Sequence, residues 1–198
     1  MIWKQTFTGR AVDMLAPSLT DIDFADVAHA LALINRYDGH THIPFSVAQH
    51  CILGAEALLN ETGDVRLAAL FLLHDAHEAY VGDIGTPVQQ ALRALDPGAL
   101  IALRELRSRF DVAIHAAAGI ALPDERETRL IKRMDIRMLR AERDALMPAK
   151  PQDWHPDVEA AEPIPSLPRS AFVWQDWHYI EQAYRYLVMD WCPSRIAA

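Results

Sequence analysis

The amino-acid sequence predicts an all-α fold, a helical bundle with a proline-rich loop and a C-terminal docking helix. Apolar residues recur at helical spacing almost throughout, and no segment alternates strictly between apolar and polar residues as a strand would. Hydrophobic residues make up 51% of the 198 positions, which is enough to build a sizeable core. At about 150 residues per domain, we expect residues 1–198 to form one domain with its core at about 24–146.

Local signals place the helices in order. Apolar residues at i, i+3 and i+4 predict a first helix over 24–36. Ser46 with Gln49 three residues later is typical of a capping box and predicts a helix that runs to about residue 60. Residues 67–73 are consecutively apolar, so we expect their helix to be buried all round. Further helices are expected over 86–95, 99–118 and 124–146.

The C-terminal quarter divides into a loop and a helix. Six of the twelve prolines fall in segment 148–168, which therefore cannot be regular helix. Long loops in compact domains are often functional, so an active-site cover, a subunit contact and a plain connector all stay open. A last amphipathic helix is expected over about 172–191. Its predicted docking face consists of Val173, Trp177, Ile180, Tyr184, Leu187 and Trp191.

Charge and composition exclude several classes of partner. Nineteen basic and 27 acidic residues give a net charge of −8, which disfavours binding to a nucleic acid polymer or an anionic membrane. There is no apolar run of transmembrane length, and segment 1–10 lacks the apolar stretch of a signal peptide, so we expect a cytoplasmic protein. Cys51 and Cys192 lie far apart and indicate no thiolate zinc site. Any metal site would use histidines and carboxylates.

Four residues on apolar helix faces form a candidate site for one divalent metal ion. His74 and Asp75 end the apolar run, where a buried carboxylate costs several kcal/mol unless a partner offsets it. Asp135 lies on the apolar face of RMDIRML, and His50 lies among apolar residues of its helix. Such a mixed set suits Mn, Co, Ni, Zn, Fe or Mg. Taken alone, each residue is also compatible with a hydrogen-bonded place in the core.

Other polar residues near these positions suggest roles in catalysis and binding. Glu78 is expected on the same helix face as His74 but one turn along. There it can accept a proton from the water that a metal ion activates for hydrolysis, or donate one to the leaving group. Arg36 can clamp a phosphate or form a surface salt bridge, and Asp83 can accept a sugar hydroxyl or cap a loop. Lys132 can reach a phosphate or be a solvated flank residue.

The ordered set of His50, His74-Asp75 and Asp135 resembles the HD-domain phosphohydrolase superfamily. Over about residues 31–139, the segments LINRY, FSVAQH, LLHDAHEAYVGDIGTPV and RMD are similar to the bacterial 5′-deoxynucleotidase branch and to related phage HD hydrolases. The resemblance implies an all-α metal-dependent phosphohydrolase. The residues it implies are the metal ligands His50, His74, Asp75 and Asp135, the catalytic acid Glu78, the catalytic and substrate-contacting carboxylate Asp83, and the nucleotide-binding residues Arg36 and Tyr37. In the branch, a tryptophan stands in place of Tyr37.

The function expected from this resemblance is 5′-dephosphorylation of a deoxynucleoside monophosphate. The first alternative is a deoxynucleoside triphosphate triphosphohydrolase. A triphosphate would need several basic residues around the pocket, so the acidic balance of the chain weakly favours the monophosphate. Alternatives of another class are a regulatory HD domain without turnover and a di-iron oxygenase, and the presence of Glu78 argues against the former. The expected partners are a small-molecule nucleotide and further copies of the chain, in a homo-oligomer with a dimer as the default.

Overall fold

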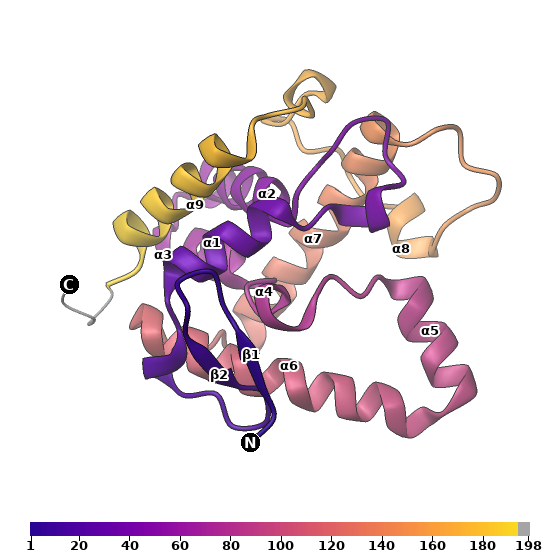
Figure 1. Ribbon diagram of the computed structural model, residues 1–198. Helices are drawn as coiled ribbons and strands as arrows, with labels where there is room; N and C mark the ends of the chain where they lie inside the picture. The colour runs from indigo at the N-terminus through magenta and orange to yellow at the C-terminus, as the bar shows by residue number, and fades with distance from the viewer. Residues whose placement is uncertain (194–198) are drawn as a thin grey trace.

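The computed structural model describes residues 1–193 and is built mainly of helices, which confirms the all-α prediction (Figure 1). The longer helices are α1 (Phe24–Leu33), α2 (Val47–Thr62), α3 (Val65–Leu73), α5 (Thr86–Leu95), α6 (Pro97–Ala118), α7 (Glu125–Leu146) and α9 (Trp177–Trp191). The shorter elements are strands β1 (Trp3–Gln5) and β2 (Ala11–Asp13), helices α4 (Glu78–Val81) and α8 (Pro156–Glu159), and the 3₁₀ turns η1 (Leu19–Asp21), η2 (Arg36–Gly39) and η3 (Arg169–Ala171).

The N-terminal β hairpin differs from the sequence prediction, which contains no strand. Strands β1 and β2 pair antiparallel with Lys4 opposite Val12. Each strand has three residues, too few to show an alternating pattern, and only Val12 among them is buried. Lys4 donates a hydrogen bond to the carbonyl of Tyr80 at 2.9 Å, so the hairpin is attached to α4.

Helix starts agree with the capping signals in the sequence. The Ser46 hydroxyl accepts from the backbone N–H of Gln49 at 3.2 Å, and the Gln49 side chain accepts from the N–H of Ser46 at 3.3 Å. A second capping box joins Asp124 to Glu127 at the start of α7. These caps satisfy N–H groups that lack partners within the helix, so helix α2 and helix α7 begin within a residue of their predicted starts.

Two helix ends fall earlier than predicted. Helix α1 ends at Leu33 because the next residues become extended, and Asn35 forms a bridge with Ser46. Helix α3 ends at Leu73 and is followed by a turn over 74–77, after which α4 begins at Glu78. Glu78 is therefore not on a helix shared with His74, and the turn carries it toward the same region.

One hydrophobic core connects the helices that hold the candidate site. Helix α2 packs against α3, α1 packs against α9, and α7 contacts both α2 and α3. The apolar run of α3 is fully buried, as predicted. Helix α5 lies at the edge of the molecule in Figure 1, where it contacts α6, and none of its residues is buried. Within residues 1–193, no helix is long and apolar enough to cross a membrane.

The C-terminal part differs in detail from its predicted form. Segment 148–168 contains the short helix α8 and is attached to the body through buried Val158 and Ile164. Helix α9 begins at Trp177 because Asp176 caps it, five residues later than expected. Its buried residues are Ile180, Tyr184 and Val188, whereas Val173, Trp177, Leu187 and Trp191 of the predicted face are exposed or only partly buried.

Candidate metal centre

The structure brings His50, His74, Asp75 and Asp135 together from three segments. His50 lies on α2, His74 and Asp75 follow the end of α3, and Asp135 lies on α7. The Nε2 atoms of the two histidines are 3.4 Å apart. Both lie within 4.0 Å of Asp75 Oδ2, at 3.8 and 3.2 Å, and of Asp135 Oδ1, at 3.6 and 4.0 Å. His50, His74 and Asp135 form a group that could hold a metal ion, and Asp75 forms a second such group with His74 and Cys51.

The spacing and chemistry of these donor atoms fit a divalent ion. At metal–ligand distances of about 2.0–2.2 Å, neighbouring ligand atoms lie about 2.9–3.5 Å apart. The observed separations of 3.2 to 4.0 Å therefore need only small adjustments. Two imidazoles and two carboxylates form a donor set that borderline and hard divalent cations accept.

Hydrogen bonds at Nδ1 orient both imidazoles. His74 Nδ1 lies 2.6 Å from the carbonyl oxygen of Phe71, and His50 Nδ1 lies 2.6 Å from Oε1 of Glu142. Both acceptors lack a hydrogen, so each Nδ1 must donate. The ring of Phe71 also packs against both histidines, with centroid separations of 5.7 Å to His50 and 4.4 Å to His74. Each imidazole is thus fixed with Nε2 turned toward the two aspartates.

The charges of the centre favour a cation there. Burial lowers the pKa of His74, but the Asp75 carboxylate outweighs this effect, and the pKa of His74 lies well above its ordinary value. Burial raises the pKa of Asp75, yet His74, His50 and Arg36 bring that pKa well below its ordinary value. A metal ion would supply the positive charge that a proton on His74 supplies in its absence.

Cys51, adjacent to His50 in the sequence, also lies in the cluster. Its sulfur is within 4.8 Å of donor atoms of His74 and Asp75. Burial raises the pKa of the Cys51 thiol to about 11, so it is a protonated thiol at neutral pH. The histidine and aspartate atoms are therefore better ligands than this sulfur, because metal ions bind the thiolate form.

Glu78 lies next to the cluster in a buried position. Its side chain is within 4.8 Å of donor atoms of Asp75 and His77, and the residue is 6% exposed. Burial, together with the charges of Asp75 and Asp83, raises the pKa of Glu78 to about 10. Its Oε2 atom is buried without a hydrogen-bond partner. His77 is held differently, since its Nδ1 lies 2.9 Å from Oδ1 of Asp111 on α6.

Arg36, Tyr37 and Asp83 surround the cluster in different ways. Arg36 is buried in turn η2, with Nη1 3.6 Å from Asp75 Oδ2. Tyr37 and Asp38 have left-handed backbone angles, φ 56° and 52°, which are uncommon for residues other than glycine. Asp83 follows α4 and is partly buried, and burial raises its pKa above the ordinary value. The positive charge of Arg36 opposes this rise in the pKa of Asp83.

The sequence analysis does not identify Glu142, which the structure places at the centre of this network. It lies on α7, seven residues after Asp135, and is fully buried. Its Oε2 accepts hydrogen bonds from Arg36 Nε at 2.9 Å and from the Tyr37 hydroxyl at 2.6 Å, while Oε1 accepts from His50. Although burial raises the pKa of Glu142, these neighbours lower it to about 2. The sequence offers one signal for Glu142: it is an acidic residue on the face of α7 that is buried, whereas most other charged residues of this helix are not buried.

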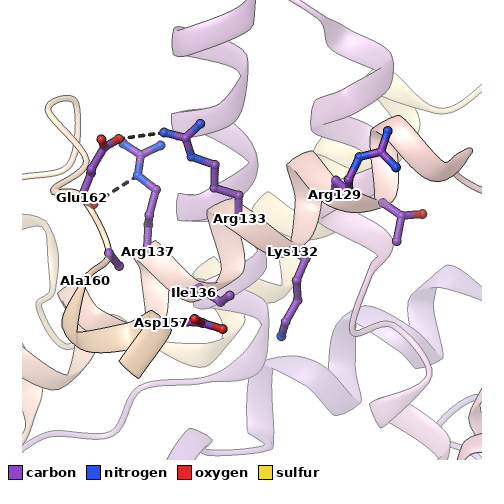
Figure 2. Close-up of a pocket in the computed structure, with 10 residues that line it drawn as sticks. Arg129, Lys132, Arg133, Ile136, Arg137, Asp157, Ala160 and Glu162 are labelled. Carbon is purple, nitrogen blue, oxygen red and sulfur yellow. Dashed lines mark hydrogen bonds and ion pairs between the residues drawn. The ribbon is translucent and has the colours of Figure 1, made fainter. Parts of the chain in front are cut away.

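A separate groove of about 600 Å³ lies between α7 and the segment that holds α8 (Figure 2). Its cations are paired with acids and carbonyl groups. Arg133 binds Glu162 at 2.7 Å, as Figure 2 shows, and Arg137 binds both carboxylate oxygens of Glu61. Lys132 lines the groove and donates to Asp135 Oδ2 at 3.0 Å. Lys132 therefore forms an ion pair with Asp135 of the metal centre, whereas Arg133 forms its ion pair with Glu162.

The fold and site define an all-α protein with a buried histidine–aspartate cluster able to hold a metal ion. No family model matches the chain. Over 124 residues it is 36% identical to an uncharacterized protein of Rhodobacter capsulatus, covering 60% of this chain and 59% of that relative, which is less than two thirds of its length. Over 143 residues it is 31% identical to the uncharacterized protein YfdR of Escherichia coli, covering 72% of this chain and 71% of YfdR. The chain belongs to the YfdR family.

Proposed function

We propose that the protein is a metal-dependent phosphohydrolase that removes the 5′-phosphate from deoxynucleoside monophosphates. One observation carries this proposal: the buried, unpartnered carboxyl oxygen of Glu78 lies beside the histidine–aspartate cluster. A buried polar atom without a partner is costly, and a substrate oxygen would satisfy it. A divalent ion at the cluster would polarise a phosphoryl oxygen and lower the pKa of water.

Glu78 is suited to act as the general acid. With its pKa raised to about 10, its carboxyl group carries a proton at neutral pH. It donates this proton to the 5′ oxygen of the nucleoside as the P–O bond breaks. Water contributes the new oxygen of orthophosphate and one of its protons returns to Glu78, so the cycle closes without a further reactant.

The substrate class rests on the charges around the cluster and on the resemblance to HD-domain nucleotidases. Arg36 Nη1 and Lys132 Nζ each lie within 4.0 Å of an aspartate of the cluster, which suits one small phosphate group. Asp83 would accept a sugar hydroxyl, as the resemblance implies. The Tyr37 hydroxyl donates to Glu142, so its ring is the part that contacts a nucleotide.

The test is a product assay on a panel of deoxynucleotides and ribonucleotides with Mn, Co or Mg. We expect orthophosphate from deoxynucleoside monophosphates. Glu78→Gln should keep its metal and hydrolyse at least about 10²-fold more slowly. Glu105→Gln, a change of an exposed carboxylate on α6, is the matched control. Release of triphosphate would replace this proposal with the triphosphohydrolase alternative, and metal binding without any release would replace it with a regulatory role.

A further inference from the structure

Glu142 connects the metal centre to the turn that carries Arg36 and Tyr37. Its side chain is completely buried, and its two oxygens accept three hydrogen bonds. The donors come from different parts of the chain, His50 from α2 and the other two from η2. A single carboxylate thus fixes the relative positions of a metal-site imidazole and the cation beside it.

We propose that Glu142 is a positioning residue, which holds His50 with Nε2 toward the metal site and holds Arg36 beside Asp75. The carboxylate can only accept, so the 2.6 Å contact requires a proton on His50 Nδ1 and leaves the Nε2 lone pair free. An imidazole whose second nitrogen donates to a carboxylate is a more basic and better oriented ligand. The inference rests on the metal site of the proposed function and is independent of which nucleotide is hydrolysed.

A purely structural role does not account for these contacts. A buried carboxylate costs several kcal/mol to desolvate, and an apolar side chain would fill the same space without that cost. The contacts also link an acid, a cation and a second acid in a row. Glu142 Oε2 is 2.9 Å from Arg36 Nε, and Arg36 Nη1 is 3.6 Å from Asp75 Oδ2. Both ends of the Glu142 carboxylate therefore lead to donor atoms of the cluster.

The test compares metal affinity in matched variants of the full chain, measured by titration with Co²⁺. Glu142→Gln keeps the shape of the side chain but weakens its hydrogen bond from His50, and we expect affinity to fall about 10- to 100-fold. Glu61→Gln is the control, because Glu61 binds Arg137 on the same helix α7 and takes no part in the cluster. Tyr37→Phe removes one donor to Glu142 and should change affinity much less than Glu142→Gln.

A spectroscopic measurement on the parent protein and on Glu142→Gln distinguishes a role of Glu142 in orienting His50 from a role in stabilising the fold. In the Zn²⁺-loaded protein, ¹⁵N NMR of the histidine rings should show His50 protonated at Nδ1 and metal-bound through Nε2. In Glu142→Gln the His50 signals should change while those of His115 on α6 stay the same. Equal Co²⁺ affinity in Glu142→Gln and the parent, or a Zn²⁺ bond through His50 Nδ1, would overturn the inference. Metal binding without phosphate release overturns the proposed function alone.

Discussion

Gly54 on α2 lies directly against the ring of Phe71 on α3, so closely that a Cβ atom at Gly54 would come within 2.2 Å of Phe71 Cε1. The same ring contacts both imidazoles of the metal centre. The missing side chain at position 54 therefore lets the helix that carries His50 approach the one that leads into His74.

Gly54→Ala should destabilise the protein for this reason. Overpacking a core costs about 1–3 kcal/mol, and a contact this close should cost about 2–3 kcal/mol, of which the better helix propensity of alanine returns about 1 kcal/mol. We expect the Tm to fall by about 2–8 °C and metal affinity to weaken as the ring shifts. Thermal unfolding and metal titration measure both. Gly85→Ala is the control, because its Cβ would lie 3.7 Å from the nearest atom, Pro87 Cδ. An unchanged Tm for Gly54→Ala would contradict the close contact.

Asp135→Ala should abolish tight metal binding. The change removes one of four donor groups and leaves Lys132 without its ion-pair partner at 3.0 Å. We expect metal content, measured by elemental analysis after dialysis, to fall below about a tenth of that of the parent, since even partners of metal ligands are worth 10- to 100-fold in affinity. Asp144→Ala alters a half-exposed acid on the same helix and should retain the metal. Full metal content in Asp135→Ala would remove Asp135 from the site.

Glu78 should make the metal-free protein less stable as the pH rises. Its pKa is about 10 in the folded protein and about 4.5 ordinarily, so above pH 4.5 the unfolded chain releases a proton that the native state keeps. The contribution of Glu78 to stability is therefore present below about pH 4.5 and is lost progressively toward pH 10.

Glu78→Gln has no charge to lose and should show this effect as a gain in Tm. In EDTA, the Tm of the variant minus that of the parent should grow between pH 5 and pH 9. Each pH unit in this interval contributes up to about 1.4 kcal/mol, and each kcal/mol corresponds to about 2–4 °C, so the total gain should exceed about 4 °C. For Glu105→Gln, an exposed carboxylate, the same difference should stay flat. A flat difference for Glu78→Gln would show that its carboxyl is already ionised.

The helices were predictable because their signals are local. Ser46 and Gln49 form the capping box that their spacing indicates, and α7 lies within a residue of its predicted range 124–146. The early end of α3 at Leu73 was not predictable, because no glycine or proline marks it and tertiary contacts stabilise the turn that follows. His77 illustrates this, since its partner Asp111 is 34 residues away.

The four proposed metal ligands were predictable because each places a polar group on an apolar face, which is costly without a partner. Glu142 has the same property, but it stands among many charged residues of α7, and its three hydrogen-bond partners lie 92 to 106 residues earlier in the chain. The partners in such a network depend on how α7 packs against distant segments, and a local sequence pattern does not indicate this packing.

Self-association is a further expectation, and the structure shows which side chains of α9 are exposed and could form the contact between copies. Tyr184 is buried against the core, whereas Tyr179, Tyr186 and Met189 of α9 are 65%, 67% and 75% exposed. We expect light scattering to give a mass above that of one 22.3 kDa chain, with a dimer as the default. Tyr186→Glu should lower this mass, and Val112→Glu, at an exposed site on α6, should not. A parent protein at the single-chain mass would contradict the expectation.

The left-handed turn at Tyr37 and Asp38 has a consequence for the order in which the chain folds. Left-handed geometry costs a residue such as tyrosine about 1–2 kcal/mol, so Tyr37 does not adopt it on local grounds. The Tyr37 hydroxyl is tied to Glu142, 105 residues later in synthesis. A nascent chain that ends before α7 lacks this anchor and also Asp135. Docking of α7 therefore completes the turn and the proposed ligand set together.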